Sequence, residues 1–300
     1  MKNYIGIDLG GTNVRVAKIS ENGTVIQEIK SVSYGTEGPS VVIPNIISLI
    51  EQIDDYNTVS GIGIGVPGPV DTINGVMKMS TNLPGFTDYP FAKEITEKLG
   101  IPTYLDNDAN VAGLAEALVG AGKDKPIVYY TTISTGIGGA LVVNGRVVSG
   151  HNGYAGEIGN IIVKDSDEII NHLNPGAVEN EASGTAITRK AKQLYPENTI
   201  TSAIDVFNKA RENDPIAKEL CKQMAKDLAS MFSAIAHIVD PNIFVIGGGV
   251  MNAQDLFFED MKKEYNNLVH LGMQNPIFTR ALLDEPGIIG AAMLPKSMGR

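Results

Sequence analysis

An apolar strand that runs directly into a two-glycine turn stands near the start of the chain and strongly limits what the chain can fold into. The stretch Ile5–Thr12 reads IGIDLGGT, with Asp8 at the end of the strand. Gly10 and Gly11 have no Cβ, so the chain can turn tightly and an anion can reach bare N–H groups, while Thr12 adds a hydroxyl. The stretch predicts a phosphate-binding hairpin, although taken alone it fits an ordinary Gly-Gly β-turn equally well.

Asp8 is a candidate magnesium ligand. Mg²⁺ prefers oxygen ligands and keeps much of its hydration, so one carboxylate at a strand end can hold it through water.

The same motif occurs a second time. Ile133–Ala140 reads ISTGIGGA, preceded by the apolar stretch Ile127–Ile133 and followed by Leu141–Val143. Two units of strand, glycine-rich turn and strand, about one domain length apart, indicate an internal duplication with a phosphate loop in each half. The repetition favours the phosphate-binding interpretation of both turns.

Composition limits the class of protein. A length of 300 residues predicts two domains, and 43% hydrophobic with 19% charged residues is typical of a soluble globular protein. The net charge of −10 argues against a nucleic-acid partner. The single Cys221, the absence of a signal-peptide pattern and the absence of a long apolar run predict a cytoplasmic protein without a membrane span.

The order of predicted elements divides the chain into two lobes, 1–118 completed by 287–300, and 119–286. In the first lobe we expect strands at 3–8, 13–19, 24–33, 59–66 and 102–105, and helices at 41–53 (with Ser40 as N-cap), 90–99 and 110–118. Strands, helix, strand, helix, strand and helix in this order are typical of an actin-like lobe. In the second lobe we expect three strands, with an Asn144-Gly145 hairpin, then helices at 182–194 and 203–211, a long helix after Asp214-Pro215 and a strand at 242–246.

Taken together, the motifs resemble the ROK family of bacterial sugar kinases and transcriptional repressors. DLGGT at Asp8–Thr12 and the whole stretch Ile133–Gly159 match the signature stretches of that family. The resemblance implies an α/β, two-lobed actin-like (ribonuclease H-like) ATPase/sugar kinase fold, with ATP and Mg²⁺ as cofactors. The repressors carry a helix-turn-helix before the first loop; here that loop begins at residue 8, so we expect a kinase.

The catalytic base is expected in the sequence DNDAN, between a strand and a helix. A sugar hydroxyl must lose a proton as it attacks the γ-phosphoryl group, and a carboxylate can accept it. From the residues alone Asp106 and Asp108 are both candidates, and either could instead be a helix N-cap. The resemblance favours Asp108 as the base, with Asn107 holding a sugar hydroxyl.

The resemblance also implies a set of sugar ligands. Glu157 in AGEIGN and Glu179 in VENEASGTA match glutamates that bind the sugar in the family, and Asn82 in NLPGF matches a segment that closes over it. Asn160 stands where most members have a histidine that binds both zinc and the sugar.

For the nucleotide, the resemblance implies the second glycine loop and a third one. Thr135, Gly136, Gly138 and Gly139 would surround the ATP phosphates, and the loop Gly247–Gly249 would bind adenosine. GGG alone is a weak signal, and the chain has no GxxxxGK[ST] sequence, so a P-loop enzyme is not expected.

The zinc site of the family is expected to be absent. Counting back from Glu179, the positions of its three cysteines hold Ile170, His172 and Ala177, and one possible ligand cannot make a tetrahedral site. We expect packing to hold this loop instead, through Leu173, Pro175 and Val178.

The substrate is left open among hexoses. We rank glucose first and keep N-acetylmannosamine, a β-glucoside and fructose, because Asn160 could widen the pocket at the anomeric end. A second hypothesis is a non-catalytic sugar-sensing regulator, which an assay of ADP release with a panel of sugars would separate from a kinase. The apolar stripe of the long helix favours a homodimer.

Overall fold

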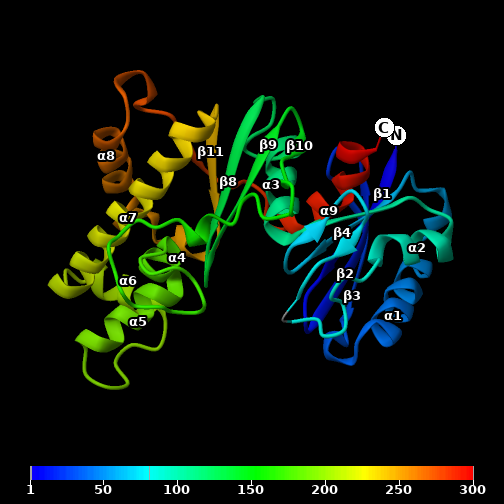
Figure 1. Cartoon of the computed structure of the whole chain (residues 1–300), viewed down its shortest axis with the longest axis horizontal. Helices are drawn as coiled ribbons and strands as arrows, with labels where there is room; N and C mark the ends of the chain where they lie inside the picture. Colours follow the sequence, from blue (N-terminus) through cyan, green and yellow to red (C-terminus); the bar gives the residue numbers. More distant parts are fainter. Residues whose placement is uncertain (1, 81, 300) are drawn as a thin grey trace. The chain divides into compact units, whose positions relative to one another are not determined.

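The computed structural model describes residues 2–80 and 82–299, and its chain forms two compact units (Figure 1). The first unit comprises Met1–Tyr130, Ala140–Gly156 and Ala281–Arg300, and the second comprises Thr131–Gly139 and Glu157–Arg280. The division passes through two strands, β8 and β9, so their first and second halves belong to different units. The lobe bounds expected from the sequence stay a prediction.

The first unit is built on a five-stranded sheet in the order β3-β2-β1-β4-β7. β1 and β2, and β2 and β3, pair antiparallel, whereas β1, β4 and β7 run parallel. The register places Asp8 opposite Gly65, and Gly65 opposite Asp106, so both acidic segments leave the sheet at the same edge. The strands are β1 (Asn3–Leu9), β2 (Asn13–Ser20), β3 (Val25–Val32), β4 (Ile62–Val66) and β7 (Thr103–Asn107), with a separate pair β5 (Val70–Asp71) and β6 (Val76–Met77).

Helices cover both faces of this sheet (Figure 1). They are α1 (Pro39–Glu51) and α2 (Phe91–Leu99) on one side, and α3 (Asp108–Val119) and α9 (Pro286–Met298) on the other. Two strand glycines let α9 lie directly on the sheet, because a Cβ on Gly63 would be 1.8 Å from the Ala291 carbonyl oxygen and one on Gly6 would be 2.3 Å from that of Ile288. The C-terminal helix is therefore part of the first core.

Two helix starts differ from the sequence prediction. α1 begins at Pro39 with Gly38 as its N-cap, so Ser40 lies in the first turn; proline at the first helical position suits a helix start, since its missing N–H has no partner there anyway. α3 begins at Asp108, two residues before the predicted start, because Asn107 caps it.

The second sheet repeats the pattern of the first, in the order β10-β9-β8-β11-β12. The three consecutive strands β8 to β10 stand in place of β1 to β3, and β11 and β12 stand in place of β4 and β7. This topology agrees with the duplication inferred from the two glycine loops. The strands are β8 (Ile127–Ile133), β9 (Ile137–Val143), β10 (Arg146–Val147), β11 (Ile243–Gly247) and β12 (Ile277–Arg280), of which β12 was missed from the sequence.

The core of the second unit joins the long helix α7 to β11, β12 and α8. Phe232 on α7 meets Phe244 on β11 with ring centroids 5.2 Å apart, and Phe244 stacks on Phe278 of β12 at 4.9 Å. Asp214 caps α7 as predicted, accepting bonds from the N–H groups of Ile216 and Ala217. The helices are α4 (Val178–Ala182), α5 (Gly184–Leu194), α6 (Ala203–Arg211), α7 (Pro215–Val239) and α8 (Phe258–Leu268); the 3₁₀ turns of the chain are η1 (Gly35–Glu37), η2 (Tyr56–Thr58), η3 (Ile158–Asn160), η4 (Gly249–Leu256) and η5 (Leu271–Met273).

The predicted helix 182–194 is in fact two helices that meet at a cap. α4 ends at Ala182, and Ser183 caps α5 by accepting a hydrogen bond from the Ala186 N–H. The serine hydroxyl satisfies an N–H that the new helix leaves unpaired, so the chain can restart in a new direction.

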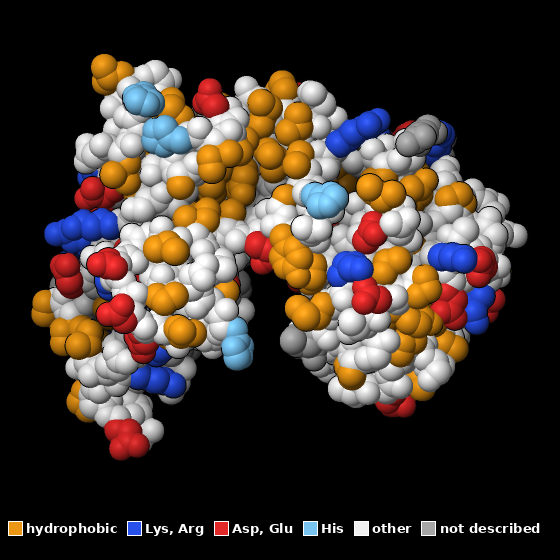
Figure 2. Space-filling view, in the orientation of Figure 1, with side chains coloured by type: hydrophobic (Ala, Val, Ile, Leu, Met, Phe, Trp, Pro, Cys, Tyr) orange, Lys and Arg blue, Asp and Glu red, His pale blue; other side chains and the backbone are white. Residues whose placement is uncertain are grey.

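On the face drawn in Figure 2, lysine and arginine side chains lie singly or in small groups, several of them beside acidic side chains. None of the helices in the described ranges has both the length and the apolar character needed to cross a bilayer.

Candidate active site

The first glycine turn closes tightly and meets a distant segment of its own unit. The Gly10 N–H donates to the Asn13 carbonyl over 2.9 Å, which forms the turn between β1 and β2. A Cβ on Gly11 would lie 3.0 Å from the Asn82 carbonyl oxygen, a tight contact, so glycine lets the two segments lie this close without a shift. The structure thus brings the predicted phosphate turn, with exposed Thr12, next to the predicted sugar ligand Asn82, which is also exposed.

Asp8 stands in a charged network at the end of β1. Its Oδ2 lies 3.9 Å from Nη1 of Arg15, which also pairs with Glu28 at 2.8 Å and with Glu285. Desolvation raises the pKa of Asp8, with Asp108 and Glu285 adding to the rise and Arg15 opposing it. The Asp8 side chain is 37% exposed, so a hydrated Mg²⁺ can reach its oxygens; this donor fits an ion that keeps its own water.

Asp106 is buried and fully engaged. Its Oδ1 accepts hydrogen bonds from the Asn107 N–H at 2.8 Å and the Asn110 side-chain amide at 2.7 Å, and its Oδ2 accepts one from the Ser149 hydroxyl at 3.2 Å. Desolvation raises the pKa of this carboxyl, and the three hydrogen bonds oppose the rise. With this set of partners, Asp106 joins the end of β7 to α3 and to the segment around Ser149.

Asp108 has a different environment two residues later. It is the first residue of α3, its side chain is exposed, and its Oδ1 accepts one hydrogen bond, from the Ala109 N–H at 2.8 Å. Surrounding protein still removes enough water to raise the pKa of Asp108 above its ordinary value. A carboxylate that is reachable and has a raised pKa can accept a proton.

Neither aspartate is the helix cap that the sequence left open. Asn107 caps α3, with its Oδ1 accepting a 2.7 Å hydrogen bond from the Asn110 N–H. The Oδ1 of Asn107 is therefore occupied by the backbone, and its Nδ2 is the atom that a sugar hydroxyl could use.

The second glycine turn is braced by Glu179. The Ser134 N–H donates to the Gly136 carbonyl at 2.8 Å, and Glu179 Oε2 accepts a hydrogen bond from the Ile137 N–H at 2.8 Å. A Cβ on Gly136 would lie 2.5 Å from this oxygen and one on Gly159 would lie 3.1 Å from it. Gly136 thus leaves space for this carboxylate, whereas a Cβ on Gly159 would first meet the Ile137 carbonyl oxygen, at 2.5 Å. Glu179 is brought against the phosphate loop.

Glu157 directly precedes the short turn η3 and Asn160 is its last residue; both are exposed. Asn160 Oδ1 accepts a 2.8 Å hydrogen bond from the Asn174 N–H. Backbone bonds from Val163 to Gly176 and from Val178 to Ile161 complete the attachment of this loop. The side chain that replaces the expected histidine therefore holds the loop through a hydrogen bond, a role that the sequence did not reveal.

The three residues expected to hold this loop by packing differ in how deeply they are buried. Val178 is buried, whereas Leu173 and Pro175 are half-buried. His172 is exposed. Within residues 2–80 and 82–299, no three histidine, cysteine, aspartate or glutamate side chains form a group that could hold a metal ion.

The third glycine loop lies beside the second one. Gly247 ends β11, and Gly248 has φ of +90°, where a Cβ would also lie 2.2 Å from the Ile133 carbonyl oxygen. A Cβ on Gly249 would be 4.0 Å from the Ser134 hydroxyl. Only glycine can occupy position 248, and this close approach places the GGG loop at the start of the predicted phosphate loop.

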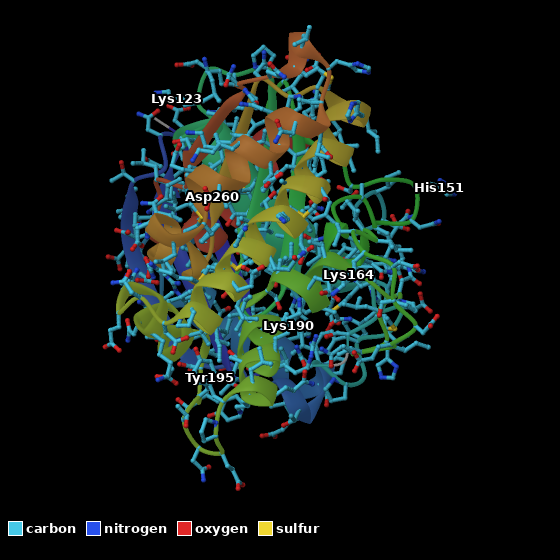
Figure 3. All side chains as sticks on the ribbon, turned by 90° about the vertical axis from the view of Figure 1, so that its left-hand side faces the viewer. Lys123, His151, Lys164, Lys190, Tyr195 and Asp260 are labelled. Atoms are coloured by element: carbon cyan, nitrogen blue, oxygen red, sulfur yellow. The ribbon has the colours of Figure 1, made fainter. Side chains whose placement is uncertain are left out.

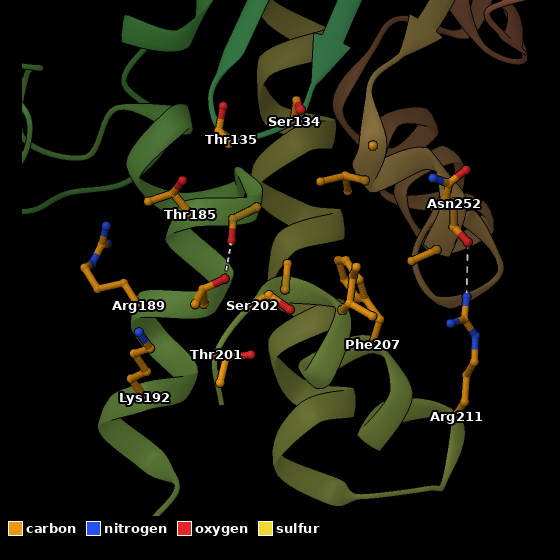
Figure 4. Close-up of a pocket in the computed structure, with 17 residues that line it drawn as sticks. Ser134, Thr135, Thr185, Arg189, Lys192, Thr201, Ser202, Phe207, Arg211 and Asn252 are labelled. Carbon is orange, nitrogen blue, oxygen red and sulfur yellow. Dashed lines mark hydrogen bonds between the residues drawn. The ribbon is translucent and has the colours of Figure 1, made fainter. Parts of the chain in front are cut away.

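A cavity of about 820 Å³ opens beside these two loops within the second unit (Figure 4). Hydroxyl groups, backbone of the glycine loops, small apolar side chains and three cationic side chains form its wall, and no described carboxylate does. The lining residues are Ser134, Thr135, Gly184, Thr185, Thr188, Arg189, Lys192, Thr201, Ser202, Ala203, Ile204, Phe207, Arg211, Gly249, Val250, Asn252 and Ala253.

Of this wall, the sequence pointed only to Thr135 and Gly249. The rest comes from α5, α6 and η4, whose participation depends on tertiary contacts. The one available signal was the run Ser183-Gly184-Thr185, small and hydroxyl-bearing residues at the start of a helix.

Comparison with known proteins gives consistent matches along the chain. The ROK family model matches residues 4–298. The glucokinase of Thermotoga maritima is 30% identical, over 97% of this chain and 96% of that protein. The crystal structure of the ROK hexokinase from Thermus thermophilus matches with a TM-score of 0.86 and 31% identity, covering 97% of each chain. A ROK family glucokinase from Streptomyces griseus, solved with glucose and AMPPNP, matches with a TM-score of 0.76 and 26% identity over 97% of this chain and 98% of that one. The predicted α/β actin-like fold is confirmed by these matches.

Proposed function

The chain belongs to the ROK family, and we propose that it is an ATP-dependent sugar kinase that phosphorylates a hexose at its 6-hydroxyl. The observation that carries the proposal is the difference between Asp106 and Asp108: one carboxylate is consumed by three structural hydrogen bonds, and the next one is exposed with a raised pKa.

In this mechanism Asp108 is the catalytic base. As the 6-hydroxyl oxygen attacks the γ-phosphorus of ATP, its proton passes to the Asp108 carboxylate, a new O–P bond forms, and the bond from the γ-phosphorus to the bridging oxygen breaks to leave ADP. Mg²⁺, when bound, neutralises charge on the phosphate oxygens, and Asp8 would hold it through water. In the first glycine turn, Gly10 uses its N–H to close the turn on Asn13, and Gly11 and Thr12 offer an N–H group and a hydroxyl to a phosphate oxygen.

The donor is proposed to bind in the second unit. Thr135, Gly136, Gly138 and Gly139 would contact the phosphates, and the cavity beside Gly247–Gly249 would take the adenosine. Its volume of about 820 Å³ lies in the range typical of small-molecule sites. The crystal structure of the Streptomyces griseus glucokinase contains the ATP analogue AMPPNP, which supports ATP as the donor.

For the sugar we propose five ligands, namely Asn82, Asn107, Glu157, Asn160 and Glu179. These side chains offer several oxygen acceptors and amide donors, which suit a ligand with many hydroxyls. Glucose is the first candidate, and N-acetylmannosamine, a β-glucoside and fructose follow. Asn160 is engaged with Asn174, which leaves its amide nitrogen for the ligand.

Release of ADP, measured in a coupled assay with a panel of sugars, tests the proposal. A kinase gives sugar-dependent ADP release with Mg·ATP and a sugar 6-phosphate as product. Binding of a sugar by calorimetry without any ADP release, for every sugar in the panel, would instead indicate a sugar-sensing regulator.

We also propose that the protein is cytoplasmic, binds no nucleic acid and acts as a homodimer. The apolar stripe of α7, with Met224, Leu228 and Phe232, is buried within this chain and so gives no support to a dimer; Ile238, near the end of the helix, is 84% exposed and is available to a partner. Sedimentation equilibrium tests the dimer, and a monomer at micromolar concentration would contradict it.

A further inference from the structure

The wall of the large cavity in the second unit is cationic although the chain carries a net charge of −10. Its three cations are Arg189, Lys192 and Arg211. Arg211 is neutralised, because its Nε and Nη2 contact the two oxygens of Asp255 at 3.0 and 2.8 Å. Arg189 and Lys192, on α5, have no carboxylate within 4 Å in the part of the chain that the structure describes. Two cations therefore face the cavity without a protein anion.

Arg189 lines two adjoining cavities of the second unit. A second cavity of about 340 Å³ adjoins the first, and Thr135, Thr185 and Arg189 line both. This second cavity also touches Gly136 and Glu179, the carboxylate that braces the loop through the Ile137 N–H. Figure 4 shows Arg189 extending along α5 beside Thr185, on the side where the Thr135 loop lies, with Lys192 one turn further along the helix.

The guanidinium of Arg189 makes one hydrogen bond within the protein and keeps other N–H donors for a ligand. Its Nη2 donates to the Asn180 carbonyl oxygen at 2.7 Å, which fixes the side chain at the end of α4. A guanidinium has five N–H donors, so several remain for a ligand.

The start of α5 itself has no amide to spare for an anion. The Gly184 N–H donates to the Ser134 carbonyl at 2.8 Å, the Thr185 N–H to the Thr135 carbonyl at 3.4 Å, and the Ala186 N–H to the Ser183 hydroxyl at 3.1 Å. A helix N-terminus usually binds anions through such N–H groups, but here they hold the phosphate loop in place. An anion on this side of the loop must therefore be bound by a side chain.

We propose that Arg189 binds a phosphate group of the nucleotide donor and so positions the phosphate chain on the Thr135–Gly139 loop. The inference rests on the proposed function, since it assumes that the large cavity takes a nucleotide. Lys192 lies one helical turn further from the loop and lines the large cavity but not the second one. It carries the same charge as Arg189 but makes no contact with the proposed phosphate position.

Calorimetric titration of the full chain with Mg·ATP, Mg·ADP and adenosine tests the role of Arg189. Arg189→Gln removes the charge but keeps a donor for the Asn180 carbonyl, and Lys192→Gln is the matched control on the same helix. We expect Arg189→Gln to weaken ATP binding about 10- to 100-fold, the range for a hydrogen bond to a charged group. Lys192→Gln should change it by less than about threefold, as for an exposed charge without direct contact.

Two further measurements separate a phosphate contact from a structural role. Adenosine affinity should stay within about twofold in Arg189→Gln, because adenosine has no phosphate to lose, and Arg189→Lys should recover part of the ATP affinity. Equal ATP affinity in wild type and Arg189→Gln, or an equal loss for adenosine and ATP, overturns the inference while the proposed function stands. A wild-type chain that binds no ATP overturns both.

Discussion

The buried carboxylate of Asp106 accepts a 2.7 Å hydrogen bond from the side-chain amide of Asn110, one turn into α3. This bond ties the end of β7 to the helix that follows it, and it leaves the exposed carboxylate of Asp108 at the junction. Two acidic residues that look interchangeable in the sequence thereby have different surroundings, and variants can separate their proposed roles.

Asp108→Asn should lower kcat by about 10²–10⁴, because the amide keeps the size of the side chain but cannot accept a proton. KM for sugar and ATP should change little, since asparagine still forms hydrogen bonds. Because the pKa of Asp108 is raised, the wild-type rate should fall on the acidic side as pH drops through that pKa and the base becomes protonated. Steady-state kinetics with the preferred sugar, repeated across pH 5–8, gives both results.

Asp106→Asn should act on stability. The amide oxygen can keep the bonds from Asn107 and Asn110, but the hydrogen bonds to a charged acceptor are lost and the Ser149 hydroxyl must turn to accept from the new amide nitrogen, which should cost about 1 kcal/mol. Urea unfolding measures this loss. If Asp106→Asn abolishes turnover while folded, and Asp108→Asn stays near wild type, the base has been assigned to the wrong carboxylate.

Gly248→Ala should destabilise the second unit and weaken nucleotide binding. Its φ of +90° is unfavourable for alanine, and the added methyl would lie 2.2 Å from the Ile133 carbonyl, so a loss of about 2 kcal/mol or more is expected. Gly249→Ala is the matched control, because its nearest atom is the Ser134 hydroxyl at 4.0 Å. Thermal unfolding of the two variants checks the pair; equal melting temperatures would contradict the role given to position 248.

The purified protein should contain no stoichiometric zinc. Ile170 and Ala177 offer no ligand atoms, His172 is exposed, and Asn160 is already bonded to the Asn174 N–H. Asn160→His should also remain free of zinc, since one added imidazole and His172 do not make a tetrahedral set. Elemental analysis of both proteins decides the matter, and one zinc per wild-type chain would refute the prediction.

Asp227→Asn should stabilise the second unit relative to wild type increasingly as pH rises. Asp227 is buried in α7; Gln223 donates to its Oδ1 at 2.9 Å, and its Oδ2 has no hydrogen-bond partner among the described residues. Desolvation raises the pKa of Asp227; Lys190 and Lys164, labelled in Figure 3, oppose this, and Glu181 between them adds to it.

The sign follows from the raised pKa. The folded state binds the proton of Asp227 more tightly than the unfolded state, so ionisation costs stability, and this cost grows as pH rises above 3.8 through the folded pKa. The unfolding free energy of Asp227→Asn minus that of wild type should therefore be larger at pH 8 than at pH 4.5. Comparing the two pH values cancels any constant cost of the new amide, and a difference that shrinks with rising pH would refute the assignment.

Features that depend on neighbouring residues could be predicted from the sequence alone. The glycine turns at Gly10-Gly11 and Gly136–Gly139 follow apolar strands directly, and the start of α7 is signalled by Asp214-Pro215. Local backbone geometry decides such features, because a strand, a turn without a Cβ or a helix cap involves only a few consecutive residues.

Features that depend on distant residues were decided by the tertiary structure. Glu179 meets the N–H of Ile137 across 42 residues, and Ser149 meets Asp106 across 43, so neither carboxylate's environment can be read from its own segment. The same holds for the cavity wall, to which α5 brings Arg189 because the first amides of that helix bond to the Ser134–Thr135 backbone. Packing of the sheets and helices decides which carboxylate is buried among hydrogen-bond donors and which stays exposed, because burial and partners come into existence only in the folded chain.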